Sequence, residues 1–505
     1  MMLIKEIEST VKRFPDKAAL VDGEIVITYR NLLNSSRGIA ELITNTQYNK
    51  IVTFTCGLLF DHEVTSIIAM IGCLYAECTY IPIEKGDPIA KIEKIILTAN
   101  LDMILTNQLS EENTNYFNKI FPKLIIVDLA TFDLFKNHDI SFKKSLNCEE
   151  VYRLPTSGST GHPKYVCQTS FAVDYYVKEY IKNLHITAND RLTLFSTLSH
   201  DASVVDIYTS LYSGATLYLC DLKNMKNIML LDRWLKKNKI TIWHSVPTFF
   251  RYFLRIHQKK NQLNHLKVFV LGGEAVLKHD YLKAAELFPA KPIYALYGQT
   301  ESSYCSGQYL THVDQVGCLG IANRCLDYRL KLENGEIYPV ENYHTKGKIG
   351  ELVLDYKIPV VGSYFKNNQR AEPKSIYSTG DIIEVREAGL YYIERKDTQV
   401  KVRGHRVQLA EIESAILSFF PNIKEVIVIQ SKRSSGEPKI IACIESTIEY
   451  NCVDINEKLN KVLSSYMLLD GVYLFDYGEL PKKNTGKLDR KKVSKIICNL
   501  KNDVV

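Results

Sequence analysis

The sequence has no long apolar run. None of its apolar stretches approaches the roughly 18 residues that a membrane-spanning helix needs. The N-terminal segment, residues 1–8, carries acidic residues where a secretory signal would carry bases followed by a long apolar stretch. We therefore expect neither a membrane partner nor export, and we predict a cytoplasmic protein.

Paired cysteines and clustered histidines are also missing. The 12 cysteines are scattered without a Cys-x-x-Cys pair, and the 12 histidines form no ligand cluster. This pattern argues against a disulfide framework and against a zinc site, and it fits a reducing cytoplasm.

Charge of one sign is not in excess. The sequence has 63 basic and 57 acidic residues. The resulting net charge of +6 over 505 residues is too small to indicate a nucleic-acid partner. The basic residues near the C-terminus are best interpreted as a solvated helix face. They are Lys482, Lys483, Lys487, Arg490, Lys491, Lys492 and Lys495.

Strand-like apolar runs alternate with helical patterns along most of the chain. Residues 123–127 and 266–271 are typical of buried strands, and residues 232–238 of a helix. This alternation predicts an α/β fold with largely parallel sheets. A charged, hairpin-like stretch at residues 395–404 precedes a short αβ segment that begins at Leu409. We place a domain boundary there, between a large multi-subdomain α/β core (residues 1–396) and a small mobile α+β C-terminal domain (residues 397–505).

A hydroxyl-rich and glycine-rich segment, LPTSGSTGHPK at residues 154–164, is suited to wrapping a nucleotide phosphate. Glycines let backbone N–H groups approach phosphate oxygens, hydroxyls donate further hydrogen bonds and Lys164 adds a charge. A P-loop is excluded because Gly161 is followed by His162 and Pro163, and not by Lys and Ser or Thr. ATP is the favoured ligand, and a solvated Ser/Thr/Gly linker is the alternative.

This segment resembles the phosphate loop of the adenylate-forming superfamily, which includes acyl-CoA synthetases, luciferases and the adenylation domains of nonribosomal peptide synthetases. Further matching segments follow in the family's order, so the resemblance covers nearly the whole chain. They are residues 201–204 (DASV), 297–301 (YGQTE), 350–352 (GEL), 378–381 (STGD), 395–404 (RKDTQVKVRG) and 484–490 (NTGKLDR). One departure is Gln299, where the family usually has proline.

The resemblance implies a set of ATP-binding residues, with Mg²⁺ as a cofactor. Tyr297 is expected to stack on adenine, Asp381 to bind the ribose hydroxyls and Arg395 to supply a second cation. From the residues alone there are alternatives. Tyr297 could be a core tyrosine, Asp381 a turn residue and Arg395 part of a surface salt bridge. The implied set is Thr156, Ser157, Gly158, Ser159, Thr160, Gly161, Lys164, Gly273, Glu274, Tyr297, Asp381 and Arg395.

Three residues are candidates for catalysis. Forming an acyl adenylate brings a carboxylate to the α-phosphorus of ATP, so positive charge is needed between two anions. Lys487, in a turn sequence, is the candidate for that charge, with an ordinary surface lysine as the alternative. Glu301, with Thr300 beside it, is the expected Mg²⁺ ligand; alternatively, Glu301 complements a helix dipole.

Asp201 decides which carboxylic acid is expected. It precedes a helical pattern, so one interpretation is an N-cap. In amino-acid-activating members of the family, however, an aspartate at this position binds the substrate's α-ammonium, and a buried anion needs such a partner. The resemblance also implies the positions that bind the substrate, when the family's pocket positions are transferred to this sequence one by one. They are Asp201, Ala202, Val205, His244, Val270, Gly272, Leu296, Tyr304 and Cys305.

These positions favour a small or medium-sized, mostly neutral amino acid. Apart from Asp201 and Lys487 they contain no fixed charge, which disfavours lysine-like or arginine-like substrates. Gly272 is expected to leave space for the substrate side chain, and Tyr304 to reduce that space. His244 is expected to form a hydrogen bond with a hydroxyl or an acid.

A second half-reaction needs a thiol. The resemblance implies a hinge at Asp397 and a loop at Lys401, Arg403 and Gly404 that enters the site for thioester formation. No carrier domain follows Lys487 in this sequence, so we expect a stand-alone adenylation enzyme, similar to D-alanine carrier-protein ligases. It would pass its aminoacyl group to the phosphopantetheine thiol of a separate carrier protein, or be a module of a larger synthetase. The alternatives are an acyl-CoA ligase acting on a carboxylic acid and a non-catalytic nucleotide-binding protein.

Overall fold

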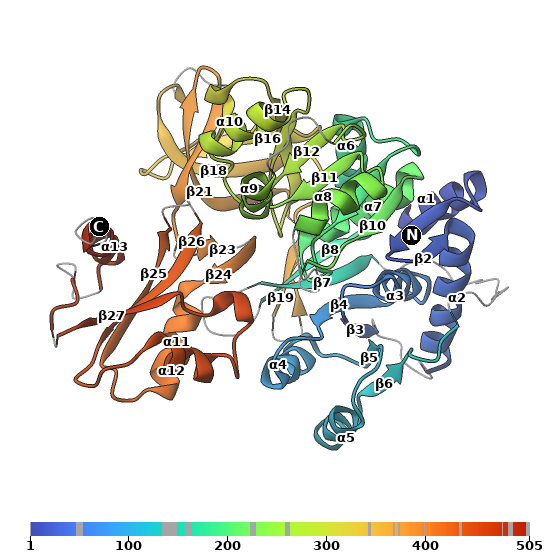
Figure 1. Ribbon diagram of the computed structural model, residues 1–505, viewed down its shortest axis with the longest axis horizontal. Coiled ribbons are helices and arrows are strands. Elements are labelled where there is room, and N and C mark those ends of the chain that lie inside the picture. Colours follow the sequence, from blue (N-terminus) through green and yellow to red (C-terminus); the bar gives the residue numbers. More distant parts are fainter. Residues whose placement is uncertain are drawn as a thin grey trace. The chain divides into compact units, whose positions relative to one another are not determined.

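The fold comprises two compact units of the chain, which we call the N-terminal unit and the C-terminal unit. The N-terminal unit contains residues 1–86, 95–155 and 165–394, and the C-terminal unit contains residues 87–94, 156–164 and 395–505. The structure is a computed structural model (Figure 1). It describes residues 2–46, 54–133, 149–156, 164–222, 229–257, 263–341, 345–366, 369–371, 374–397, 399–402, 404–433, 437–476, 478–482 and 488–500.

The sheet that carries most of the predicted substrate positions has the strand order β15-β14-β13-β12-β11-β9-β10-β1-β2 among the described residues. Neighbours from β13 to β1 are parallel, and the pairs at both edges are antiparallel. Central strands such as β10 and β12 are buried at every position, which explains their continuous apolar sequences. The strands are β1 (Ala18–Asp22), β2 (Ile25–Thr28), β9 (Arg191–Leu194), β10 (Thr216–Leu219), β11 (Ile242–Ser245), β12 (Val268–Leu271), β13 (Ile293–Gln299), β14 (Ser303–Leu310) and β15 (Ile321–Ala322).

A second sheet has the order β20-β19-β8-β7-β4-β3-β5-β6 in the described part of the chain. Its pairs around β3, β4, β5 and β6 are parallel. The prediction of an α/β fold is therefore confirmed. The strands are β3 (Thr55–Phe60), β4 (Thr79–Glu84), β5 (Met103–Thr106), β6 (Ile125–Asp128), β7 (Glu150–Thr156), β8 (Lys164–Thr169), β19 (Ser363–Lys366) and β20 (Gln369–Arg370).

A third sheet, with the order β17-β16-β18-β21-β22, differs from the expectation of parallel strands. The pairs β16–β17, β16–β18 and β18–β21 are antiparallel. Buried and accessible residues alternate along β16 and β21, because an antiparallel sheet can leave one face to solvent. The strands are β16 (Leu326–Lys331), β17 (Ile337–Pro339), β18 (Ile349–Tyr356), β21 (Ile376–Arg386) and β22 (Gly389–Arg395).

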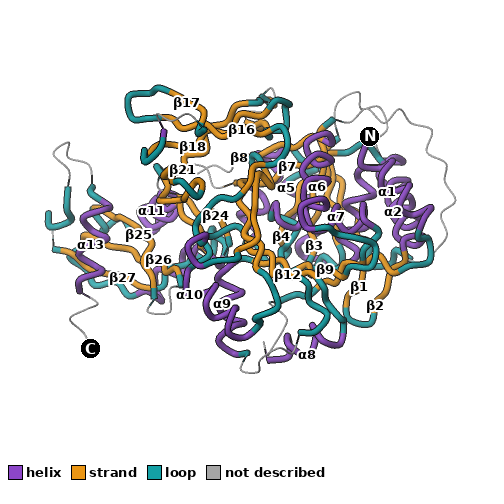
Figure 2. Tube along the Cα trace, turned by 90° about the horizontal axis from the view of Figure 1, so that it is seen from above, coloured by secondary structure: helices purple, strands orange, loops and turns teal. Residues whose placement is uncertain are grey.

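Helices before residue 395 cover these sheets, and α6 and α7 pack against each other (Figure 2). None of the helices in the described ranges is both long enough and apolar enough to cross a bilayer. The helices are α1 (Met2–Arg13), α2 (Tyr29–Thr46), α3 (Val64–Tyr75), α4 (Ile89–Ala99), α5 (Glu111–Ile120), α6 (Ser170–Leu184), α7 (Asp201–Ser213), α8 (Met229–Lys237), α9 (Pro247–Ile256), α10 (Lys278–Leu287) and the 3₁₀ turn η1 (Val313–Gln315).

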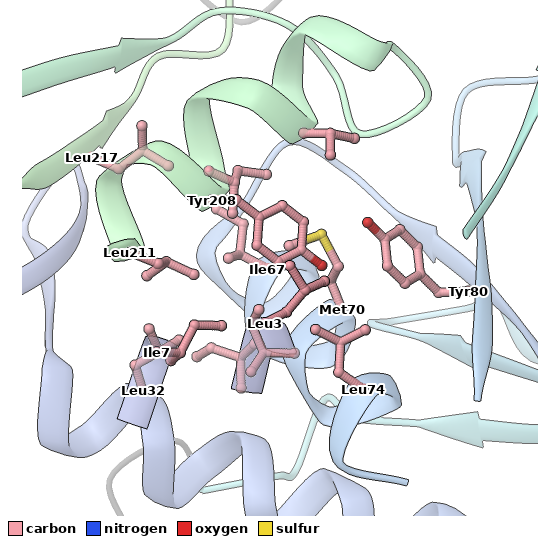
Figure 3. Packing of buried hydrophobic residues seen from close by; sticks show 14 of the residues in the cluster. Leu3, Ile7, Leu32, Ile67, Met70, Leu74, Tyr80, Tyr208, Leu211 and Leu217 are labelled. Carbon is pink, nitrogen blue, oxygen red and sulfur yellow. The ribbon is translucent and has the colours of Figure 1, made fainter. Parts of the chain in front are cut away.

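The main core gathers helices α1, α2, α3 and α7 (Figure 3). Helix α1 contributes one apolar stripe, including Leu3 and Ile7, whereas α3 has no charged residue and is buried at every position. From α7 come Tyr208 and Leu211, both fully buried. The core therefore fixes α7, the helix that begins at Asp201.

Residues 395–505 of the C-terminal unit form a small α+β arrangement, drawn in orange to red in Figure 1. Its sheet has the order β25-β26-β27. Successive side chains along a strand point to opposite faces, and in this sheet both faces are apolar. Val426 and Val428 pack with α11 and α12, whereas Ile427 and Ile429 pack with Val493 of α13. The elements are β23 (Gln399–Val402), β24 (His405–Gln408), α11 (Leu409–Phe419), β25 (Glu425–Lys432), β26 (Pro438–Glu445), α12 (Cys452–Leu459), η3 (Ser465–Met467), β27 (Gly471–Phe475) and α13 (Arg490–Leu500).

A buried ion pair between α9 and α10 gives a stability prediction. Arg251 donates from Nε and Nη2 to the two carboxylate oxygens of Asp280, each at 2.7 Å, and the side chains are 4% and 0% exposed. Arg251→Met leaves Asp280 charged and buried, so we expect a loss of about 3–5 kcal/mol. Thermal unfolding should show a clearly lower melting temperature.

The matched control is Lys283→Met, which removes a cation from the exposed pair Lys283–Glu286 on α10. We expect this change to cost at most about 1 kcal/mol. Equal melting temperatures for the two variants would show that burial of the Arg251–Asp280 pair is not important for stability.

Candidate active site

The candidate substrate residues lie on α7 and on four adjacent strands of one sheet. Strands β11, β12 and β13 are parallel neighbours, and His244 pairs with Val270, which in turn pairs with Tyr294. Open α/β sheets bind ligands beyond the carboxyl ends of such strands. The sheet therefore brings together positions that are separated by about a hundred residues of sequence.

Asp201 is the first residue of α7, and its carboxylate has no partner among the residues that the structure describes. His200 is the N-cap residue, and the helix start has no side-chain cap, so the N-cap interpretation of Asp201 is wrong. Asp201 is half-buried, and its side chain makes no hydrogen bond or ion pair with any residue that the structure describes. A partly desolvated anion in this position is suited to a cationic ligand.

The groups around Asp201 are neutral. Tyr152 and Tyr176 are buried, with their hydroxyl oxygens 3.2 Å apart. Burial raises the pKa of both tyrosines, and the charge of Asp201 raises it further. Burial likewise raises the pKa of the Cys305 thiol to about 11, despite hydrogen bonds that lower it. These three groups are therefore uncharged at neutral pH and leave the charge of Asp201 unbalanced.

The other predicted pocket positions are mostly buried. Ala202 is half-buried and Val205 and Val270 are buried. The space expected beside Gly272 is already filled, because a Cβ atom there would lie 2.3 Å from Cδ1 of Leu296. The hydroxyl of Tyr304 is also engaged: it lies 2.6 Å from the Tyr294 hydroxyl and accepts a hydrogen bond from Asn183.

Asp206 contacts one of the predicted pocket residues, and the sequence interpretation missed it. Its Oδ1 lies 2.7 Å from Nδ1 of His244, and both side chains are buried. The signal was available in the sequence, since Asp206 follows Ala202 by four residues and therefore shares its side of the helix.

The proposed adenosine-binding residues form a hydrogen-bond network. Oδ2 of Asp381 accepts from the hydroxyl of Tyr297 and from Nε2 of Gln299, each at 2.6 Å. The hydroxyl of Tyr377 donates to Oε1 of Gln299 at 3.0 Å, which fixes the amide. Burial, and then the charge of Asp381, raises the pKa of Tyr297, so its hydroxyl stays a donor. Gln299, which departs from the family pattern, thus helps to orient Asp381.

Backbone geometry explains two glycines of this network. A Cβ atom on Gly298 would lie 1.9 Å from the carbonyl oxygen of Ser303, so only glycine allows β13 and β14 to approach here. Gly380 has a φ of +74° where the pairing of β18 with β21 shifts register. The expectation that Asp381 lies on a turn is therefore wrong, because it belongs to a bulged strand.

Glu301 lies in the link between β13 and β14 and is 1% exposed. Its Oε1 accepts from the Tyr364 hydroxyl at 2.6 Å, and its backbone oxygen accepts from Gln168 and from the N–H of Gly362. The alternative of a helix-terminal acid is wrong, since no helix begins here. Thr300 precedes it and is half-buried.

Glu274 has a structural partner. Its Oε2 accepts from the N–H and the hydroxyl of Thr248, at 3.1 and 2.5 Å, in the first turn of α9. Gly273 before it has a φ of +82°. This carboxylate therefore holds the start of α9 against the link that follows β12.

The two ends of the phosphate-loop segment are joined. Strands β7 and β8 are neighbours, and the Thr156 hydroxyl donates to the carbonyl oxygen of Lys164 at 3.1 Å. The predicted residues Ser157, Gly158, Ser159, Thr160 and Gly161 lie outside the described residues.

Arg395 and the expected hinge residue Asp397 interact within the C-terminal unit. Nε and Nη2 of Arg395 donate to the two carboxylate oxygens of Asp397, at 3.2 and 2.9 Å, and Nη2 also donates to Gln399. The alternative interpretation of Arg395 as part of an ion pair thus describes this structure, although the guanidinium side chain is only 15% exposed.

The expected thioester loop is a hairpin turn between β23 and β24. Val402 pairs with His405, Gly404 has a φ of +83°, and the carbonyl oxygen of Lys401 accepts from Gln430. Arg403 and Lys487 lie outside the described residues. Lys482 and Leu488, on either side of the segment containing Lys487, form an antiparallel β bridge.

A family model described as AMP-binding enzyme matches residues 7–360. D-alanine--D-alanyl carrier protein ligase from Staphylococcus epidermidis is 28% identical over 513 residues, covering 98% of this chain and 99% of that protein. Tyrocidine synthase 3 from Brevibacillus parabrevis is 26% identical, and the match covers 97% of this chain and 7% of the synthase.

Solved structures share the fold. A Vibrio cholerae adenylation domain in complex with glycyl-adenosine-5'-phosphate matches with a TM-score of 0.81 and 21% identity, covering 98% of each chain. An o-succinylbenzoate CoA synthetase from Bacillus subtilis matches with a TM-score of 0.82 and 18% identity, covering 97% of this chain and 98% of that one. At such identities these structures establish the fold alone.

The network at Asp381 predicts a role for Gln299. Gln299→Leu removes the amide that donates to Asp381, and we expect AMP to bind about 5- to 150-fold more weakly, because the cost of an unmade buried hydrogen bond is about 1–3 kcal/mol. Isothermal titration calorimetry with AMP gives the dissociation constant.

The matched control is Gln308→Leu on β14, where the amide donates to the carbonyl oxygen of Gln315 at 3.4 Å and to no other described residue. This variant should bind AMP like the parent. If Gln299→Leu does so too, Gln299 does not orient Asp381 for the nucleotide.

Proposed function

The chain belongs to the AMP-binding enzyme family, and from this premise we propose that it activates an amino acid and passes it to a carrier protein. In the first step the amino acid and ATP form an aminoacyl adenylate and release pyrophosphate. In the second step the aminoacyl group is transferred to the phosphopantetheine thiol of a separate carrier protein. The reaction belongs in the cytoplasm, where thiols stay reduced.

The unpartnered carboxylate of Asp201 carries the choice of an amino acid. It is half-buried beside two buried tyrosines and a buried thiol, all uncharged, and it makes no ion pair with a described residue. A substrate α-ammonium supplies the missing charge through charge-assisted hydrogen bonds. A simple carboxylic acid would leave the anion unbalanced, which argues against the acyl-CoA ligase alternative.

Adenylation requires in-line attack of the substrate carboxylate on the α-phosphorus of ATP. We assign to Lys487 the role of bridging the carboxylate and the phosphate oxygens, which reduces repulsion between two anions. The hydroxyls and N–H groups of residues 156–164 would hold the phosphates, Asp381 the ribose and Tyr297 the adenine. Arg395 would join the nucleotide site after exchanging its Asp397 partner.

Glu301 has the chemistry of a Mg²⁺ ligand. It offers hard carboxylate oxygens, and one of them is oriented by the Tyr364 hydroxyl. In the described part of the chain no group of three His, Cys, Asp or Glu residues could hold a metal ion, so phosphate oxygens and waters would complete the coordination. Bound Mg²⁺ would neutralise phosphate charge, with Thr300 as a neighbouring oxygen donor.

The carrier step is supported by two lines of argument. The D-alanine--D-alanyl carrier protein ligase relative matches along 99% of its length, and residues 397–505 contain the hairpin of Lys401 and Gly404. We propose that residues 397–505 move as a domain about Asp397, relative to residues 1–396, between the two steps. The Arg395–Asp397 ion pair would then stabilise one of the two positions.

The ammonium assignment predicts the outcome of Asp201→Asn. ATP–pyrophosphate exchange with the best amino acid should fall at least about 30-fold in kcat/KM, because the change removes one member of a buried charge pair. The control Glu111→Gln also removes an acid from the first turn of a helix, but on α5, far from these residues in sequence, and should retain full exchange. Parent activity restricted to acids that lack an amino group would instead identify an acyl-CoA ligase.

Lys487→Ala tests the catalytic assignment. We expect pyrophosphate exchange to fall by about 10²–10³-fold, as for loss of one group that stabilises transition-state charge. Lys492→Ala, an exposed lysine of α13, serves as the control and should exchange like the parent. An unchanged rate in Lys487→Ala would exclude the proposed mechanism.

A further inference from the structure

A buried histidine–aspartate pair lies among the proposed substrate residues. Nδ1 of His244 is 2.7 Å from Oδ1 of Asp206, and the side chains are 6% and 2% exposed. Within the described residues, the Asp206 side chain makes no other hydrogen bond or ion pair. The pair is thus a self-contained unit of two side chains, and the His244 ring packs against Tyr180 with 6.0 Å between the ring centroids.

Helix geometry places Asp206 beside one of the proposed pocket positions. Residues 202 and 206 are one turn apart, so Asp206 lies on the side of α7 that carries Ala202. On the sheet side, His244 pairs with Val270, another of the proposed pocket positions.

The pair leaves one nitrogen atom for a ligand. Burial raises the pKa of Asp206, and the His244 ring opposes that rise. When Nε2 of His244 carries a proton it is a donor. Without that proton Nε2 is an acceptor. Nε2 forms no hydrogen bond with a described residue.

We infer that His244, positioned by Asp206, recognises a hydroxyl group on the side chain of the amino acid that the enzyme activates. This inference rests on the proposed amino-acid activation and narrows its substrate class. A hydroxyl both donates and accepts, so it satisfies Nε2 in either protonation state. An apolar side chain would leave Nε2 desolvated and unpaired, and a carboxylate would place a second anion next to Asp206.

The neighbouring side chains restrict the size of this substrate. Leu296 fills the space beside Gly272. The Tyr304 ring packs edge-on against Tyr180, at a centroid distance of 5.3 Å, and its hydroxyl is held by Tyr294. The recognised side chain is therefore small, of the size of serine or threonine.

The experiment compares hydroxylated amino acids with their isosteres in ATP–pyrophosphate exchange. Serine is compared with 2-aminobutyrate and threonine with valine, each as the L and the D enantiomer. Alanine and aspartate are tested as well. We expect kcat/KM for one hydroxylated amino acid to exceed that of its isostere at least about tenfold, since a site built for a hydroxyl rejects the analogue that lacks it.

Variants connect this preference to the pair. His244→Leu should reduce the ratio of kcat/KM for the hydroxylated amino acid to kcat/KM for its isostere to near one. His244→Gln, which keeps hydrogen-bonding groups, should retain part of this preference. Asp206→Asn should raise KM for the hydroxylated substrate more than for its isostere. The control is His257→Leu. Nδ1 of the buried His257 lies 3.3 Å from Oδ1 of the half-buried Asp232, and neither residue is one of the proposed pocket positions. The ratio of this variant should equal that of the parent.

Melting temperatures verify that each variant is folded, and a hydroxyl preference that survives in folded His244→Leu overturns the assignment to His244. A hydroxyl preference that His244→Leu abolishes and His257→Leu preserves supports it. Equal or better exchange with alanine, 2-aminobutyrate, valine or aspartate overturns it while leaving amino-acid activation intact. Exchange with no amino acid overturns both the inference and the proposed function.

Discussion

The burial of helix α7 is the constraint on which the candidate site depends. From Ser203 to Tyr212 every residue of α7 is buried, so the helix cannot rotate or shift without opening the core. The residues at its two ends, Asp201, Ala202 and Ser213, are half-buried. Packing of apolar residues thereby holds a charged group where solvent only partly screens it, at a cost that a cationic ligand can offset.

Neutral polar groups complete the site around this helix. Buried tyrosines and a buried thiol surround Asp201 without compensating its charge, whereas Asp206 has His244 as its partner. Two aspartates five residues apart on one helix therefore have different electrostatic settings. This difference is the physical basis for assigning one to the α-ammonium and the other to positioning His244.

At the proposed nucleotide-binding residues, too, packing of distant segments fixes the position of a carboxylate. Asp381 belongs to a bulged strand of the antiparallel sheet, and Tyr297 and Gln299 reach it from β13 of the mostly parallel sheet. Both donors bind one oxygen of the carboxylate, which fixes its orientation before any ligand arrives. Preorganisation of this kind lowers the cost of binding a ribose.

The sequence by itself determined the fold class and the family, because apolar periodicity and motif spacing are local properties. It did not determine the antiparallel third sheet, the bulge at Asp381 or the filling of the space beside Gly272 by Leu296. Nor did it reveal that Gln299 and Asp206 are hydrogen-bonding partners of Asp381 and His244. Those facts depend on which distant segments become neighbours, and only the packed tertiary structure decides that a given donor and acceptor are within 3 Å of each other and shielded from water.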